Sequence, residues 1–146
     1  MRDAAAVRAA LQGVDVVVHL AAINGTENFY KHPERVLEVA VKGIVNVVDG
    51  AIAERVNDVI VASSSEVYQT PPRIPTDEEV PLVVPDPLNS RYSYGGSKIL
   101  SELYALNFGR RHFRRVIVFR PHNVYGPAMG AEHVIPQFVL RIAGAP

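Results

Sequence analysis

Three short runs of apolar, largely β-branched residues constrain the fold of this chain more than any other feature of its sequence. The first spans residues 14–20, the second lies within residues 57–62 and the third covers residues 116–119. Each is too short for a buried helix and nearly uninterrupted, which is typical of a strand covered on both faces of a parallel sheet. Helical segments between the runs imply right-handed crossovers, so the sequence predicts an α/β fold with a doubly wound parallel sheet.

Helical patterns occupy most of the remaining chain. The alanine-rich stretch from Asp3 to Leu11 begins at a residue suited to cap a helix, and Gly13 is suited to end it. A second helix is predicted to begin at Pro33, and its predicted buried face comprises Leu37, Val41, Ile44, Val48 and Ile52. A third helix is predicted over about residues 90–111 and a fourth from about residue 134. The predicted buried side of the third helix comprises Ile99, Leu103 and Leu106.

A long connection, residues 69–90, separates the second strand from the third helix and holds six of the eleven prolines. A loop of this length is uncommon unless it is functional or disordered, and its prolines favour a rigid, extended path. Four arginines follow near the end of the third helix, where cations complement the helix macrodipole. They are Arg110, Arg111, Arg114 and Arg115.

Composition excludes several kinds of partner and site. Fifteen basic and fifteen acidic residues balance, so neither nucleic acid nor an anionic membrane is a predicted partner. The chain has no cysteine, which excludes disulfides and thiolate catalysis. No ligand spacing joins His19, His122 and His133, so no metal site is predicted. Without an apolar run of about 18 residues or a signal peptide, a cytoplasmic location is expected.

Tyr94 and Lys98 form a pair with a chemical use. Side chains four residues apart on a helix project from one face and can reach a common site. A free phenol ionises near pH ~10, and a fixed cation beside it favours the phenolate. Tyr94 is therefore predicted to accept a proton at neutral pH, although this spacing alone is also typical of an ordinary surface pair.

Four segments occur in a characteristic order, at residues 16–22, 63–68, 94–98 and 120–127. Together they resemble the extended short-chain dehydrogenase/reductase family, specifically its NAD-dependent nucleotide-sugar epimerases and dehydratases. The resemblance covers nearly the whole chain and implies a partial Rossmann-like sheet, with residues 1–146 forming a single, truncated NAD-binding domain. The family opens with a G-x-x-G-x-x-G loop that nothing here matches, so this chain alone is expected to bind NAD weakly or not at all.

The resemblance also implies roles for residues just beyond the three strands, where a ligand of such a sheet lies. Ser64 aligns with the family's catalytic serine or threonine, with Ser63 and Ser65 as the nearest alternatives. The implied catalytic residues are Ser64, Tyr94, Lys98 and Glu66. The implied NAD contacts are Leu20, Ala21, Ala22, Ser63, Tyr94, Lys98 and Pro121. The implied substrate contacts are Ser65, Asn123, His133 and Val134.

The implied function of the full-length form is a nucleotide-sugar epimerase, with a homodimer as the usual assembly. Dehydratases of the family carry acidic residues after the catalytic serine, and Ser65 replaces the first of these. The Ser65-Glu66 pattern resembles decarboxylases of the family more closely, so Glu66 is either a chemical group or a loop carboxylate facing water. A decarboxylase, a 4,6-dehydratase and a non-catalytic Rossmann-like module are the alternatives.

Overall fold

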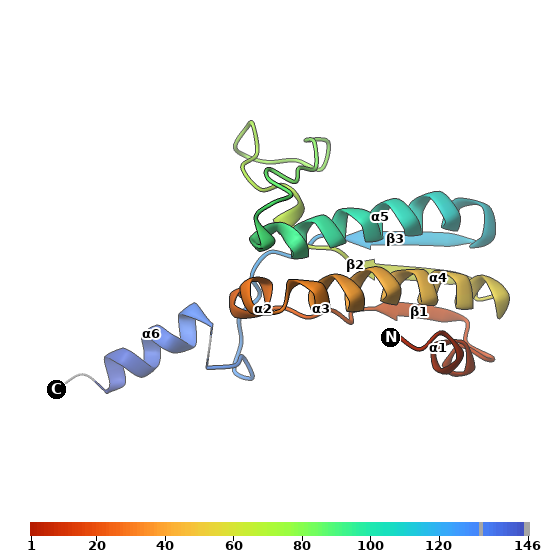
Figure 1. Cartoon of the computed structure of the whole chain (residues 1–146), viewed down its shortest axis with the longest axis horizontal. Coiled ribbons are helices and arrows are strands. Elements are labelled where there is room, and N and C mark those ends of the chain that lie inside the picture. Colours follow the sequence, from red (N-terminus) through yellow and green to blue (C-terminus); the bar gives the residue numbers. More distant parts are fainter. Residues whose placement is uncertain (132, 145–146) are drawn as a thin grey trace.

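The protein is built around one parallel sheet, as its computed structural model shows for residues 1–131 and 133–144. The strands β1 (Val16–His19), β2 (Asp58–Ala62) and β3 (Arg115–Phe119) lie in the order β1-β2-β3. Val59 of β2 pairs with Val17 on one side and Val116 on the other, so the three carboxyl ends meet at one edge. The predicted α/β fold with a partial Rossmann-like parallel sheet is confirmed (Figure 1).

Two long helical rods run along the sheet (Figure 1). In chain order the helices are α1 (Ala4–Ala10), α2 (Thr26–Lys31), α3 (Pro33–Leu37), α4 (Gly43–Ala53), α5 (Ser93–His112) and α6 (Val134–Ala143). A π turn, η1 (Glu38–Lys42), joins α3 to α4, and the short 3-10 turns η2 (Ser65–Val67) and η3 (Ser90–Tyr92) flank the long connection. α4 and α5 contact each other, whereas α6 projects from the rest of the molecule (Figure 1). The sequence patterns had not indicated α2.

The first helix forms for the reasons that the sequence indicated. The Asp3 carboxylate accepts a hydrogen bond from the Ala6 amide at 3.0 Å and so caps α1. Gly13 follows the helix with a φ of +69°, a left-handed conformation that glycine adopts without steric cost. After this turn the chain enters β1.

The buried face of the second helical rod differs from the predicted one. Ile44 and Val48 are buried as expected, but Leu37 is exposed and Val41 only half-buried. Val36 and Ala40 are buried instead. The π turn η1 holds more residues per turn than an α-helix, which rotates the side chains before it relative to those after it. An α-helical period carried through this turn therefore assigned the wrong residues to the core.

Small and polar side chains, not the predicted leucines, form the buried face of α5. Leu103 is 58% exposed, and Ile99 and Leu106 are half-buried. The residues that face inward include Ser97, Ser101, Ala105 and Gly109. The hydroxyl groups of Ser97 and Ser101 donate to helix carbonyls at 2.7 and 2.8 Å, so their burial leaves no hydroxyl unpaired.

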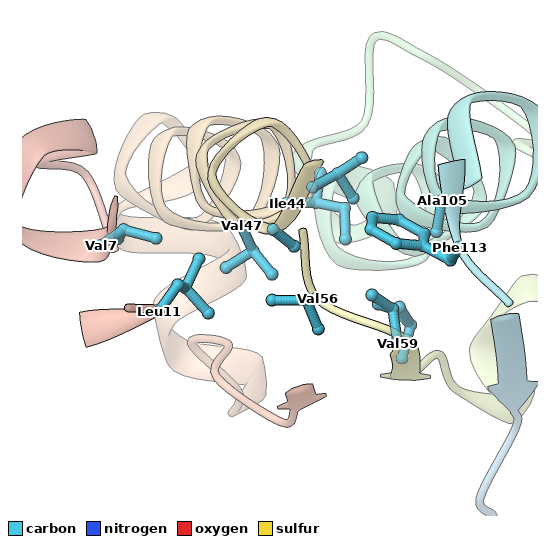
Figure 2. Close-up of a cluster of buried hydrophobic side chains, with 11 residues drawn as sticks. Val7, Leu11, Ile44, Val47, Val56, Val59, Ala105 and Phe113 are labelled. Carbon is cyan, nitrogen blue, oxygen red and sulfur yellow. The ribbon is translucent and has the colours of Figure 1, made fainter. Parts of the chain in front are cut away.

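One face of the sheet carries the main hydrophobic core. Its side chains come from α1, α4, α5 and the sheet, and they converge between these elements (Figure 2). Side chains on the opposite face are exposed among the described residues: Val16, Val18, Ile117 and Phe119. The prediction that the strands are covered on both faces is therefore wrong for β1 and β3 within the described residues, whereas no residue of β2 is exposed.

Two of the four clustered arginines have a structural partner at the amino end of the sheet. The buried carboxylate of Asp58 accepts hydrogen bonds from Arg114 at 2.8 Å and from Arg115 at 2.8 Å. The hydrogen bond from Arg114 is the main reason that the pKa of Asp58 falls to about 2. This pairing fixes where the chain leaves α5 and enters β3.

Gly109 marks the closest approach of α5 to β3 and generates a stability prediction. A Cβ atom added at Gly109 would lie 2.5 Å from Cγ2 of Val116. Gly109→Ala is therefore expected to lower the free energy of unfolding by about 1–3 kcal/mol through overpacking, although alanine favours helices. Gly126→Ala is the matched control, because a Cβ there meets nothing within 4 Å. Chemical denaturation measures both variants, and equal stability would contradict this close packing.

Candidate active site

The carboxyl ends of the three strands bring the four sequence segments to one edge of the sheet. His19 ends β1, Ser63 follows β2 and Arg120 follows β3. Backbone hydrogen bonds continue the pairing beyond the sheet, since the Ser63 amide donates to Phe119 at 2.8 Å and the Ser65 amide to Pro121 at 3.0 Å. The loops after β2 and β3 are thereby held against each other.

Ser64, Tyr94 and Lys98 lie together beside the end of β2. All three are buried, and Lys98 and Tyr94 occupy the first two turns of α5. The Lys98 ammonium donates to the Ala62 carbonyl at 2.7 Å and lies 5.6 Å from the centre of the Tyr94 ring, within cation–π range. The Ser64 hydroxyl accepts a hydrogen bond from the Glu66 amide at 3.2 Å, and it lies close enough to the Tyr94 phenol to influence its pKa. The structure thus brings together three of the side chains that the sequence predicted to be catalytic.

Burial dominates the titration of this group. It raises the pKa of Tyr94, and the charge of Glu66 adds to the rise, while the Ser64 hydroxyl opposes it. Burial also lowers the pKa of Lys98. The expectation that Lys98 holds the pKa of Tyr94 below its usual range is therefore wrong for this arrangement, because desolvation disfavours the phenolate. Tyr94 carries its proton at neutral pH.

Glu66 is neither free nor directed only at water. Both of its carboxylate oxygens accept hydrogen bonds from Nη2 of Arg91, at 3.0 and 3.1 Å. The Arg91 guanidinium lies 5.2 Å from the ring centre of Phe29. Phe29 in turn stacks on Tyr94, with ring centres 5.1 Å apart and an angle of 19° between the planes. The sequence left Glu66 as either a chemical group or a loop carboxylate facing water. The structure adds a third role, because Glu66 forms an ion pair with Arg91.

Sequence reasoning missed the site positions of Phe29 and Arg91. Arg91 lies just before the tyrosine segment in the sequence. Its residue type was the usable signal, because arginine commonly pairs with carboxylates such as that of Glu66. Phe29 belongs to α2, whose six residues are too few to show a helical period. Its burial became visible only from the packing of α2 against η3.

A polar cleft of about 390 Å³ opens beside the ion pair. Ser65, Glu66, Arg91, His122 and Asn123 contribute to its lining. Two predicted substrate contacts, Ser65 and Asn123, therefore share this cleft. The other two, His133 and Val134, lie where α6 begins and do not line it (Figure 1).

The predicted cofactor contacts divide into a buried and an exposed group. Ser63 is buried, and its hydroxyl has no hydrogen-bond partner within residues 1–131 and 133–144. Leu20 and Ala21 are exposed beyond the end of β1, while Ala22 and Pro121 are half-buried. A buried hydroxyl without a partner is a group that a bound ligand can satisfy.

Arg120 holds one wall of the cleft in place. Its guanidinium binds both carboxylate oxygens of Glu102 on α5, at 2.8 and 2.6 Å. Nη1 of the same guanidinium donates to the Tyr68 hydroxyl at 2.8 Å and to the Glu78 carbonyl at 3.4 Å. One side chain thereby ties β3 to α5, to the end of η2 and to the long loop. The sequence placed Arg120 in a family segment but gave it no role.

His19 is a further titratable group at this edge, and the sequence assigned it no role. It is buried, and burial, followed by the nearby charge of Lys98, lowers its pKa from 6.5 to about 4. The imidazole is therefore neutral at pH 7. It lies close enough to Lys98 that a positive charge on both side chains at once would be electrostatically unfavourable.

The lowered pKa of His19 predicts a loss of stability in mild acid. Below pH 6.5 His19 is protonated in the unfolded chain, whereas in the folded chain it stays neutral down to about pH 4. The free energy of unfolding therefore decreases as the pH falls through that interval. His19→Asn is expected to have a flatter stability profile between these pH values. Denaturant unfolding at several pH values measures both proteins, and parallel profiles would contradict the buried, neutral imidazole.

Residues 1–131 and 133–144 contain no group of three His, Cys, Asp or Glu side chains arranged to hold a metal ion. None of the helices within these ranges has the length and apolar character needed to cross a membrane.

Known proteins place this geometry in a family. The sequence is 31% identical over 140 residues to a dTDP-glucose 4,6-dehydratase of Streptomyces antibioticus, covering 96% of this chain and 40% of that protein. A dTDP-glucose 4,6-dehydratase of Streptomyces venezuelae, solved with NAD bound, superposes with a TM-score of 0.83 at 30% identity, over 97% of this chain and 42% of its own. A UDP-N-acetylglucosamine 4-epimerase of Methanobrevibacter ruminantium superposes with a TM-score of 0.82 at 26% identity, over 94% of this chain and 44% of its own.

The chain thus spans less than half the length of these relatives. Its match to the family is nevertheless nearly complete, extending over residues 1–145. Both epimerases and dehydratases occur among the relatives, and the solved dehydratase holds the cofactor that the sequence predicted. The chain belongs to the NAD dependent epimerase/dehydratase family, as the order of its four segments indicated.

Proposed function

We propose that the full-length protein carrying this sequence is an NAD-dependent nucleotide-sugar epimerase. The observation that supports this most is the hydrogen bond from Lys98 to the Ala62 carbonyl, which sets Tyr94 and Lys98 beside Ser64 at the end of β2. Ligands of such sheets lie beyond the carboxyl ends of the strands, where these three side chains are found.

The buried groups at this edge fit the nicotinamide-ribose end of NAD. Lys98 uses one N–H on Ala62 and has further donors for ribose hydroxyls. The Ser63 hydroxyl has no partner within the described residues and would gain one. NAD, when bound, supplies the chemistry of accepting a hydride from a sugar carbon and returning it.

Tyr94 and Ser64 serve the proton that accompanies this hydride. Because the buried Tyr94 phenol is protonated at neutral pH, it must first lose that proton to solvent before it can act as a base. As the sugar hydroxyl then becomes a carbonyl, its proton passes to the Tyr94 phenolate, and in the reverse step the Tyr94 hydroxyl gives it back. Ser64 lies close to the Tyr94 phenol and can hydrogen-bond the reacting oxygen. Return of the hydride to the opposite face inverts the carbon without net oxidation.

The paired state of Glu66 favours epimerisation over its alternatives. Dehydration and decarboxylation each call for acid or base groups beyond Tyr94, and Glu66 is the carboxylate in the cleft lining. Its two oxygens are engaged by Arg91, and Ser65 is too weak an acid to replace a carboxyl group. The dehydratases among the relatives keep dehydration as the second candidate, and a non-catalytic module is the candidate from another class.

Product analysis tests the proposed reaction. The full-length protein is incubated with NAD and a panel of UDP-, GDP- and dTDP-sugars that includes a uronic acid. An isomer of unchanged mass is the expected product, because hydride and proton both return to the sugar. Loss of water or of carbon dioxide would instead establish the dehydratase or the decarboxylase. The absence of both NAD binding and product would favour the non-catalytic module.

Substitutions at Tyr94 and Lys98 separate chemistry from cofactor binding. Tyr94→Phe is expected to reduce kcat by about 100-fold or more while leaving NAD affinity nearly unchanged, because only the proton-carrying oxygen is lost. Lys98→Ala is expected to impair both, since it also loses a ribose contact. Tyr104→Phe is the matched control, because its hydroxyl binds Asp49 at 2.8 Å away from the site. Full turnover by Tyr94→Phe would contradict the role given to this phenol.

Exposed leucines on α5 support a homodimer. Leu100 and Leu103, which lie about one turn apart on the helix, are 38% and 58% exposed. Leu103→Lys is expected to shift the protein toward monomer in light scattering coupled to size-exclusion chromatography, because a charge there resists burial. Ile74→Lys is the control, since Ile74 is 89% exposed in the long loop. A monomeric parent protein, or equal effects of the two substitutions, would rule out this interface.

A further inference from the structure

We propose that Phe29 and Arg91 are positioning residues for Tyr94. In this proposal Phe29 fixes the plane of the phenol ring, and Arg91 neutralises the Glu66 carboxylate beside it. The proposal rests on the proposed function, in which Tyr94 exchanges the proton of a sugar hydroxyl. It concerns residues that the sequence segments did not assign to the site.

The geometry forms an unbroken series of contacts. Glu66 is paired with Arg91, the Arg91 guanidinium lies 5.2 Å from the Phe29 ring centre, and Phe29 is stacked on Tyr94 at 5.1 Å. Phe29 and Tyr94 are 3% and 9% exposed and belong to one buried cluster with Val36. The stacked Phe29 ring and the Lys98 ammonium, 5.6 Å from the Tyr94 ring centre, leave the phenol little room to tilt, so the stack restricts where the Tyr94 hydroxyl lies.

Arg91 is built into this arrangement and is not an exposed surface cation. Its Nη2 atom serves both oxygens of Glu66, while its Nη1 atom is buried without a hydrogen-bond partner within the described residues. A buried donor without a partner is costly. Its position against the face of Phe29 provides the cation–π contact that offsets part of this cost.

The charges around Tyr94 indicate how Arg91 would act. Glu66 approaches from η2 and Arg91 from η3, while Lys98 lies one turn along α5 and His19 adjoins Lys98 from β1. The α2 and α3 segments present apolar Phe29 and Val36. Glu66 is the charge that raises the pKa of Tyr94, so a cation paired with Glu66 limits that rise. Removing Arg91 would leave Glu66 to act unopposed.

A double-mutant cycle read by NMR tests this without substrate or NAD. The chain is labelled with ¹³C at tyrosine Cζ, the Tyr94 signal is assigned by its absence in Tyr94→Phe, and its pKa is measured in four proteins. These are the parent chain, Arg91→Gln, Glu66→Gln and the double variant. The expected order of Tyr94 pKa values is Glu66→Gln lowest, then the parent, then Arg91→Gln. The double variant is expected to match Glu66→Gln, because Arg91 acts through Glu66.

Each outcome of the titration bears on the proposal. An unchanged Tyr94 pKa in Arg91→Gln would overturn it, and so would an equal effect of that substitution in the Glu66→Gln background. Circular dichroism establishes that each variant folds. If Arg91→Gln does not fold, Arg91→Lys is used in its place, and a Tyr94 pKa equal to that of the parent then supports charge neutralisation. A Tyr94 pKa in Arg91→Lys as high as the value expected for Arg91→Gln would overturn the proposal.

The role of Phe29 is tested in the full-length enzyme by separating kcat from KM. Phe29→Leu retains an apolar side chain of similar volume but loses the stacked ring. It is expected to lower kcat by about tenfold or more while changing KM less than about twofold, because misorientation of the phenol affects the reacting geometry. Ile74→Ala in the exposed long loop is the control. An unchanged kcat would remove Phe29 from the proposal even if the enzyme proves to be an epimerase.

Discussion

The site depends on how closely α5 packs against the sheet. Small residues at four positions of its inner face, including Ala105 and Gly109, leave little side-chain volume between helix and strands. This proximity brings the Lys98 ammonium within 2.7 Å of the carbonyl that ends β2. A helix held farther out by leucines could not make that bond, and its tyrosine would no longer face Ser64. Packing at one end of α5 therefore determines chemistry at the other.

The sequence predicted the parts of this protein whose periods are regular and local. Strand runs, the Asp3 cap and the tyrosine–lysine spacing could each be identified because the responsible residues are close in the chain. The inner faces of α3 and α5 could not be assigned in the same way. A π turn changed the phase at Leu37, and close packing reversed the usual preference for large apolar residues at Leu103.

The strands present a different case. Their apolar pattern is typical of a sheet covered on both faces, whereas the described residues cover mainly one face. Val16 and Val18 alternate with half-buried Val17 and buried His19, so the β1 sequence is apolar on both faces although only one face is covered here. The apolar residues of a strand indicate which of its faces tend to be covered, but not which element covers them. The raised pKa of Tyr94 was missed for a related reason, since the Lys98 spacing shows a nearby cation but not the depth of burial.

Two arginines hold the short turn η2 and the residue that follows it in place. Arg91 binds Glu66 within the turn, and Arg120 binds the Tyr68 hydroxyl just after it while also engaging the buried carboxylate of Glu102. Burying such charges brings little net stability, because the loss of hydration offsets much of the attraction between them. Guanidinium groups do fix direction, however, since their planar donors accept few alternative geometries. Apolar packing around η2 would tolerate small rotations of the turn, and each rotation would move Ser64 relative to Tyr94. The ion pairs are therefore better understood as constraints on the geometry of the site than as sources of its stability.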